Sequence, residues 1–316
     1  ALALPTRTCS SAAPPAAWAT CSGLGRSKES QWDWKHWKAW GLIRLLGGLD
    51  DHPIAGQIMG THPDEMAQSA QVLAAMGFDV IDVNFACPVK KVSKANRGGH
   101  FLTAPEEAID VLRAVRAAVP AEIPTSVKLR RAWDDTPEME QNFDRIFEAL
   151  YDEGYVWATV HGRTVEQKYV GPSRWQFLRD LTTRYPDRLI FGSGDIWEAA
   201  DVFRMLDATG VHAVSVARGC IGNPWIFQQT RQLMAGETPM TPTLEEQRSV
   251  LLEHYRFSVA LHGEHRASKM MRKFGIQFSK HHPRPDEAKA AFIRCRSLAE
   301  WHDAIREMYG PSASAP

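Results

Sequence analysis

The stretch DVIDVNFACPVKKV, residues 79–92, places a thiol where an apolar strand ends. Residues 79–85 carry the β-branched and apolar side chains of a strand buried in a parallel sheet. Cys87 follows with Pro88 directly after it, and Lys90 and Lys91 come next. Nearby positive charge favours a thiolate, a thiol in a pocket can instead donate a proton, and most free cysteines are inert and buried. The motif alone leaves these three roles open.

The same pattern of a short apolar strand followed by a helix repeats along the chain. Strands are predicted at 54–59, 79–85, 125–130, 155–163, 188–195 and 211–219. Helices are predicted at 62–77, 104–119, 137–152, 173–183 and 197–208, and GNPWIF opens another at 222–227. Alternation of this kind indicates a parallel sheet covered by helices.

Polar side chains stand at the carboxyl end of nearly every predicted strand, namely Gln57, Asn84, Lys128, His161, Ser193 and Arg218. All these ends converge in a closed barrel, whereas an open doubly wound sheet uses only those at its switch point. We therefore predict an α/β fold, a (β/α)8 TIM barrel. Since six units are visible, its first two strands must lie within residues 1–50 or be absent.

The chain divides into three predicted parts. Residues 1–41 form an atypical, possibly disordered N-terminal segment, and residues 42–238 form the barrel. Residues 239–310 form a small C-terminal helical bundle, with amphipathic stretches at 241–263, 264–279, 285–294 and 297–308.

The composition bounds the class of protein. Lysine plus arginine equals aspartate plus glutamate at 37 each, so only local clustering can attract a nucleic acid. The five cysteines form no CxxC pair, which predicts no metal site and a cytoplasmic setting. No apolar run approaches the roughly 18 residues of a membrane span. We expect a monomer. Residues 1–28 lack acidic side chains, as in an organelle transit segment or a disordered terminus.

Two glycine-containing turns follow the last two strands: FGSGDI at 191–196 and ARGCIGNPW at 217–225. Such turns can hold an anion with backbone N–H groups, or they can be ordinary tight turns. Lys128 and His161 could meet an electron-rich ring in the same mouth, although single residues of these types are more often structural.

The motifs NFACPVKKV, VKLR, VHGRTVEQKYVGPSRW, GSGDI and VARGCIGNPWIF resemble, in order and spacing, those of the tRNA-dihydrouridine synthases. SKMMRKFG at 268–275 is similar too. The resemblance implies an FMN-containing barrel followed by a helical tRNA-binding domain. Flavin reduced by NADPH would pass a hydride to the C5–C6 double bond of specific uridines in tRNA.

The resemblance also implies roles for individual residues. Cys87 would donate the proton to the other carbon, which makes it the catalytic residue. Cofactor binding would fall to Gln57, Asn84, Lys128, His161, Ser193, Gly194, Asp195, Ala217, Arg218 and Gly219. Lys128 would stabilise negative charge on the reduced ring, and the last five would surround the phosphate.

A basic rim around the mouth would receive the tRNA. It would consist of Lys90, Lys91, Arg97, Arg130, Arg163, Arg272 and Lys273. The alternative is a solvated charged edge without a partner.

The chain also departs from the family pattern. Ala86 stands where glycine is usual, Ser193 where asparagine is usual, and Phe274 where histidine is usual. The LAPM-like first strand and the Glu-Met pair of the second are not found. Two other functions therefore stay open: an RNA-binding protein with impaired catalysis, or a flavin oxidoreductase acting on a small pyrimidine.

Overall fold

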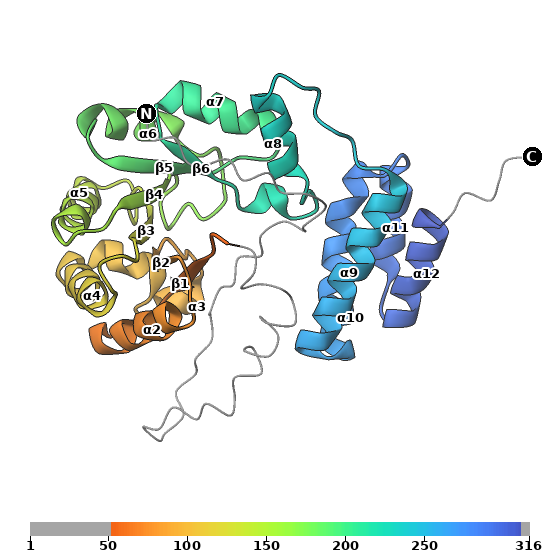
Figure 1. Cartoon of the computed structure of the whole chain (residues 1–316), viewed down its shortest axis with the longest axis horizontal. Helices are drawn as coiled ribbons and strands as arrows, with labels where there is room; N and C mark the ends of the chain where they lie inside the picture. Colours follow the sequence, from red (N-terminus) through yellow and green to blue (C-terminus); the bar gives the residue numbers. More distant parts are fainter. Residues whose placement is uncertain (1–51, 311–316) are drawn as a thin grey trace, which may run out of the picture.

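The computed structural model describes residues 52–310 of the chain. Within them one parallel sheet holds its strands in sequence order and curls into a half-barrel (Figure 1). The strands are β1 Ala55–Ile58, β2 Val80–Phe85, β3 Thr125–Arg130, β4 Trp157–His161, β5 Leu189–Ser193 and β6 Ala213–Ser215. All six predicted strands are confirmed; β3 has the predicted range and the other five are shorter than predicted. The full eight-stranded barrel stays a prediction, because the two further strands were expected in residues 1–50, which lie outside the described part.

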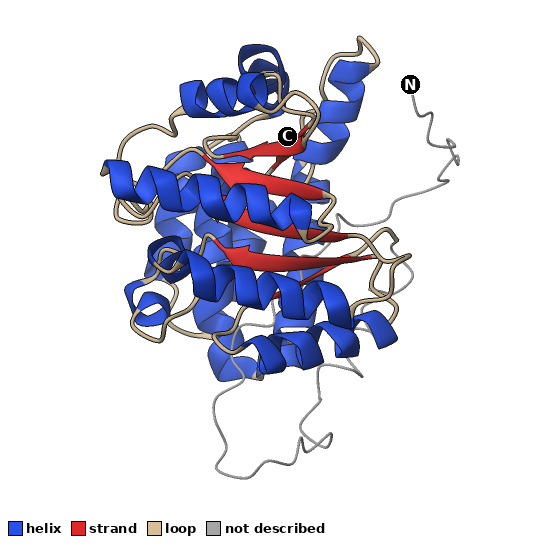
Figure 2. Cartoon of the chain, turned by 90° about the vertical axis from the view of Figure 1, so that its left-hand side faces the viewer, coloured by secondary structure: helices blue, strands red, loops and turns tan. Residues whose placement is uncertain are grey.

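Helices cover the outer face of the sheet (Figure 2). They are α2 Pro63–Ala75, α4 Pro105–Ala118, α5 Pro137–Asp152, α6 Trp175–Arg184, α7 Ala199–Thr209 and α8 Ile226–Met234. Three of them begin at a proline, whose fixed φ suits the first turn of a helix. Helix α7 ends at Gly210, which has φ +70° and closes the helix in a left-handed conformation.

One face of the sheet, formed by every second residue of β2 and β3, is apolar and buried. Ile81 and Val83 of β2 and Val127 and Leu129 of β3 have no exposed surface. Burying each such side chain contributes about 1.5–3 kcal/mol. The alternate positions of the same strands point to the other face and are polar, namely Asp82 and Asn84 in β2 and Ser126 and Lys128 in β3.

Four further helices follow the sheet. They are α9 Leu244–His262, α10 Glu264–Phe278, α11 Pro285–Arg294 and α12 Leu298–Tyr309, with the short η4 Ser279–His281 after α10. They share a hydrophobic core of their own around Met271, Phe292 and Trp301. Helix α9 begins with a capping box between Thr243 and Glu246. Within residues 52–310, no helix is both long and apolar enough to cross a bilayer.

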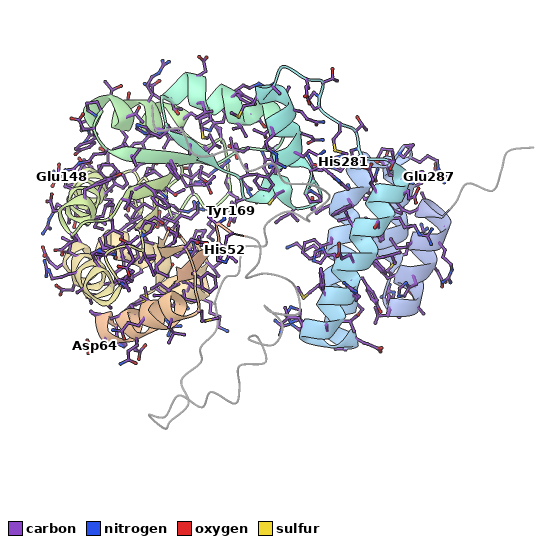
Figure 3. All side chains as sticks on the ribbon, in the orientation of Figure 1. His52, Asp64, Glu148, Tyr169, His281 and Glu287 are labelled. Atoms are coloured by element: carbon purple, nitrogen blue, oxygen red, sulfur yellow. The ribbon has the colours of Figure 1, made fainter. Side chains whose placement is uncertain are left out.

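The loop that follows β6 joins the two cores. The ring of Trp225 meets that of Phe278 edge-on at 5.8 Å, and it also contacts His281 at 6.2 Å. Gly222 has φ +87°, and a Cβ there would lie 2.6 Å from the Gln277 carbonyl carbon. His281 lies at the end of the helical region nearest α8 (Figure 3). The loop therefore packs closely against the end of α10.

Candidate active site

A cavity of about 230 Å³ lies at the carboxyl ends of the strands. Its lining includes most of the predicted site residues: Asn84, Cys87, Lys128, Arg130, His161, Ser193, Gly194, Asp195, Ala217 and Arg218. These residues lie between positions 84 and 218 of the sequence. The parallel topology brings together the carboxyl ends of the strands that carry them. The cavity is smaller than the roughly 300 Å³ at which sites for drug-sized ligands begin. The described residues therefore enclose only part of a ligand as large as a flavin.

One side of the cavity is built around Cys87, and we call it the thiol wall: Gln57, Asp82, Asn84, Ala86 and Cys87. The side-chain oxygen of Asn84 accepts hydrogen bonds from the backbone N–H groups of Ala86 at 3.0 Å and Cys87 at 2.7 Å. This is the local turn that asparagine favours. It fixes the loop at the end of β2 and presents the half-buried thiol to the cavity.

A chain of side-chain hydrogen bonds supports this turn from beneath. Asn84 Nδ2 donates to Gln57 Oε1 at 2.8 Å, and Gln57 Nε2 donates to Asp82 Oδ2 at 2.6 Å. Ser126 Oγ donates to Asp82 Oδ1, also at 2.6 Å. Backbone donors at one end and an acidic acceptor at the other leave only one orientation for each amide. Asp82, which the sequence analysis did not single out, therefore orients two of the predicted residues.

The cysteine loop is also held from outside. Gly99 N–H donates to the Cys87 carbonyl at 3.0 Å, and Arg130 Nε donates to the Ala86 carbonyl at 2.8 Å. Gly98 has φ +60°, and a Cβ there would lie 2.9 Å from the Cys87 Cβ. The segment after α3 Lys90–Ser93, which continues into η2 Gly98–Thr103, therefore needs glycine where it crosses the loop.

Lys128 reaches into the middle of the cavity from β3. Its Nζ donates to Ser193 Oγ of β5 at 3.4 Å, across the intervening strand β4. Burial lowers the pKa of Lys128 to about 8, while the charge of Asp82 opposes the shift. The ammonium is therefore still mostly protonated at pH 7 but is easily neutralised above pH 8.

His161 at the end of β4 is neutral. Burial, together with the charges of Arg130, Lys128, Arg163 and Arg218, lowers the pKa of His161 to about 2. Its Nδ1 accepts a hydrogen bond from the Arg163 backbone N–H at 3.2 Å. This bond assigns the proton to Nε2. The imidazole can therefore donate a hydrogen bond from Nε2 without carrying charge.

Another side of the cavity follows β4, β5 and β6, where Tyr169, Asp195 and Arg218 line it. Arg163 contacts Asp195 and Trp197 contacts Arg218, and we call these five residues the arginine wall. Asp195 is held with φ +60° next to Gly194 with φ +112°. Its carboxylate accepts from Arg163 Nη2 at 2.7 and 2.8 Å and from Arg218 Nη2 at 3.2 Å. Two guanidinium groups thus share one carboxylate, which leaves an excess of positive charge.

Two donors beside Asp195 lack a partner among the described residues. They are the buried atoms Arg163 Nη1 and Ser173 Oγ. The backbone N–H of Ser173 donates to Asp195 Oδ2 at 2.7 Å, so both atoms belong to residues that already contact this carboxylate. Buried donors without acceptors cost about 1–3 kcal/mol each, and an anion bound here would offset that cost.

Gly219 and Gln57 were predicted to touch the cofactor, but neither lines the cavity. A Cβ on Gly219 would lie 2.2 Å from the Ile196 carbonyl, so this glycine lets the last two strand-end loops approach each other. Gln57 lies behind Asn84 and orients it.

Two arginines that were predicted on the basic rim are buried instead. Arg130 is 2% exposed and donates to the carbonyls of Ala86, Thr164 and Lys168. Arg163 is 3% exposed and is held by Asp195 and the Gly171 carbonyl. Both therefore serve as framework for the loops.

The other predicted basic residues do lie toward solvent. Lys90 and Lys91 are exposed on α3, directly after the cysteine loop, and Arg272 and Lys273 are exposed on α10. Arg97 is half-buried, with its Nε 3.4 Å from Thr61 Oγ1. None of these five lines the cavity.

Comparison with known proteins gives a consistent result. The family model described as "Dihydrouridine synthase (Dus)" matches residues 43–309. A probable tRNA-dihydrouridine synthase of Mycobacterium tuberculosis is 34% identical over 228 residues, 71% of this chain and 58% of that protein. tRNA-dihydrouridine synthase B of Shewanella oneidensis is 34% identical over 69% of this chain and 66% of its own length. A probable tRNA-dihydrouridine synthase of Rickettsia bellii is 31% identical over 80% and 76%. The chain thus spans under two thirds of the length of some of these relatives.

Proposed function

The chain belongs to the dihydrouridine synthase family, and on that premise we propose that it reduces uridines in tRNA to dihydrouridine. The observation that supports this best is the convergence of Cys87, Lys128 and His161 on one cavity. A thiol, a cation and a neutral donor are the groups that a proton-coupled reduction of a uracil ring requires.

The cofactor of the proposed reaction is FMN, with NADPH as its reductant. The donor set of the cavity suits it. Lys128 and the Nε2–H of His161 can meet ring carbonyl oxygens, and the free donors of Arg218 can meet a phosphate. Reduced FMN, when bound, supplies the hydride for the C5–C6 double bond.

The side chains of the protein supply the proton, hold the thiol in place and stabilise charge. Cys87 Sγ–H donates a proton to the uracil carbon that does not receive the hydride. Asn84 holds the Cys87 loop through the two backbone hydrogen bonds, and this keeps the thiol in place. The Lys128 ammonium stabilises negative charge on the ring system, and burial strengthens that interaction.

The target uridine has to leave its stack to reach such a cavity. We propose that the exposed lysines of α3 and the basic residues Arg272 and Lys273 of α10 bind the tRNA backbone. In this proposal the helices from α9 onward form the tRNA-binding domain, and the sheet belongs to a TIM barrel. The exposed basic residues favour an RNA substrate over a small pyrimidine.

The first experiment tests the reaction. Purified wild-type protein should be yellow, with flavin absorbance at about 450 nm. Cys87→Ala should keep this absorbance and lose tRNA reduction by about 100-fold or more, because a positioned proton donor contributes about 10²–10⁴-fold.

Cys220→Ala is the matched control, since Cys220 is also half-buried but does not line the cavity. It should retain full activity. If Cys87→Ala still reduces tRNA at the wild-type rate, the role of the thiol is wrong. A colourless protein that nevertheless binds tRNA would favour the RNA-binding alternative.

A further inference from the structure

The guanidinium of Arg218 lies between two aromatic rings. Its Cζ is 4.5 Å from the centroid of the Tyr169 ring and 4.6 Å from that of the Trp197 ring. The three residues come from three different loops, which follow β4, β5 and β6. Figure 3 shows Tyr169 at the edge of the sheet unit, in the direction of the C-terminal helices.

Tyr169 and Trp197 are both exposed, at 52% and 48%. Large aromatic side chains are usually more buried than this, so their contacts with Arg218 are informative about the site. The backbone of Trp197 is fixed just before α7, because its N–H donates to Asp201 Oδ2 at 2.9 Å. The stack is therefore anchored at a helix start.

The polar edge of Arg218 is fixed separately. Its Nη2 donates to Asp195 Oδ1 at 3.2 Å, and the side chain lines the cavity with 32% exposure. Among the described residues this is its single hydrogen bond, although a guanidinium has five N–H donors. Stacking on two faces and one bond at the edge leave the other donors oriented and available.

The position of the stack points to an anion. Arg218 shares Asp195 with Arg163, and the unpartnered Arg163 Nη1 and Ser173 Oγ are next to the same carboxylate. In (β/α) barrels the phosphate group of a ligand commonly binds after the last two strands. The loops after β5 and β6 supply Trp197, Asp195 and Arg218.

We propose that Trp197 is a positioning residue: together with Tyr169 it clamps Arg218 so that its free donors bind the phosphate monoester of the flavin. This inference rests on the proposed function, because it takes FMN as the ligand. Trp197 itself need not touch the cofactor. Its effect should therefore be confined to the phosphate and should not extend to the isoalloxazine ring.

Riboflavin provides the direct test, since it differs from FMN only by lacking the phosphate. Full-length protein freed of bound flavin is titrated with FMN and with riboflavin, and binding is followed by flavin fluorescence. The wild type should bind FMN more tightly. Trp197→Ala should weaken FMN binding by about 3- to 10-fold and leave riboflavin binding unchanged, as expected for loss of one cation–π contact. Trp197→Phe should restore most of the FMN affinity.

Several outcomes would overturn the inference. An equal loss for both flavins, or no loss for either, would mean that Trp197 does not act through the phosphate. A loss of tRNA affinity with unchanged FMN binding would assign the clamp to the RNA backbone. Equal wild-type affinities for FMN and riboflavin would overturn the inference but leave the proposed flavin chemistry intact. If the wild type binds neither flavin, the proposed function fails and the inference fails with it.

A second variant covers the case in which Trp197→Ala does not fold. Arg218→Lys keeps the charge but loses the planar group that stacks between the rings. It should show the same selective loss of FMN over riboflavin. Unchanged FMN preference in this variant would also contradict the clamp.

Discussion

The thiol wall and the arginine wall face the same cavity, but different interactions hold them. The thiol wall is fixed by short hydrogen bonds that run from Asp82 through Gln57 and Asn84 to the backbone of Cys87. The arginine wall is fixed by ion pairs on Asp195 and by half-exposed aromatic rings around Arg218.

The difference follows from what each wall has to do in the proposed reaction. A proton donor must be placed to within a fraction of an ångström, and a buried hydrogen-bond chain with one permitted orientation provides that. Binding an anion requires excess positive charge and free donors, and these tolerate partial exposure. The comparison predicts that changes in one wall leave the function of the other intact.

The largest effect is expected at the buried end of the hydrogen-bond chain. Asp82→Asn keeps the size of the side chain but replaces one acceptor with a donor, so Gln57 Nε2 keeps an acceptor only if Ser126 Oγ turns to accept from the new amide. It also removes the carboxylate charge that acts on the buried Lys128 ammonium. We expect the free energy of unfolding to fall by about 2–3 kcal/mol, as for a buried polar group left unpaired. We also expect faster alkylation of Cys87 by iodoacetamide, measured by mass spectrometry of its peptide.

Ser126→Ala is the control for this change. It removes one hydrogen bond to Asp82 but leaves the link through Gln57 to Asn84 intact. It should cost about 1 kcal/mol and leave the alkylation rate of Cys87 unchanged. In both variants the preference for FMN over riboflavin should persist. A loss of that preference in Asp82→Asn would break the independence of the two walls.

The second prediction concerns Lys128, which lies between the walls. Its pKa is about 8 in the folded protein and 10.5 in its ordinary state. Between these values unfolding takes up a proton, so this lysine makes the free energy of unfolding rise with pH, by up to about 1.4 kcal/mol per pH unit. From pH 8 to pH 10 the wild type should gain at most about 2–3 kcal/mol relative to Lys128→Met, as measured by urea denaturation.

The same titration should appear in activity. Above pH 8 the ammonium loses its proton, so tRNA reduction should decline with an apparent pKa near 8. FMN binding should change less, because the arginine wall stays charged. If the free energy of unfolding of Lys128→Met rises with pH as steeply as that of the wild type, a group other than Lys128 causes the rise.

The sequence predicted much of this arrangement because its clues are periodic. Nearly every strand has a polar residue near its carboxyl end, and parallel pairing places those residues together, as in the pairing of Asn84 with Lys128. The ends of helices also carry local signals, such as Pro137 at the start of α5 and Gly210 after α7. These features depend on local spacing, which can be seen in one dimension.

What the sequence did not predict depends on contacts between loops. Nothing about Arg130 in isolation shows that three carbonyls from other loops will bury it. Trp197 and Tyr169 are 28 positions apart, and their stack on Arg218 exists only once three loops meet. Asp82 lay within the quoted strand, but its partners Gln57 and Ser126 come from the two neighbouring strands.

The smallest effect is expected at Ala86, where the family usually has glycine. Ala86 is not among the described residues with positive φ, so its Cβ causes no strain. Ala86→Gly should lower the free energy of unfolding by about 0.5–1 kcal/mol through added freedom of the unfolded chain. Activity should stay within about twofold of the wild type, because Ala86 uses only its backbone atoms in its hydrogen bonds with the side chains of Asn84 and Arg130.

Gly98→Ala is the informative contrast on the facing segment. Its φ of +60° and the 2.9 Å approach of a new Cβ to the Cys87 Cβ should displace the thiol. Cys87 alkylation and tRNA reduction should therefore change in Gly98→Ala and not in Ala86→Gly. If Ala86→Gly changed them as strongly, side-chain packing at Ala86 would also hold the thiol wall, and hydrogen bonds would no longer suffice to explain its rigidity.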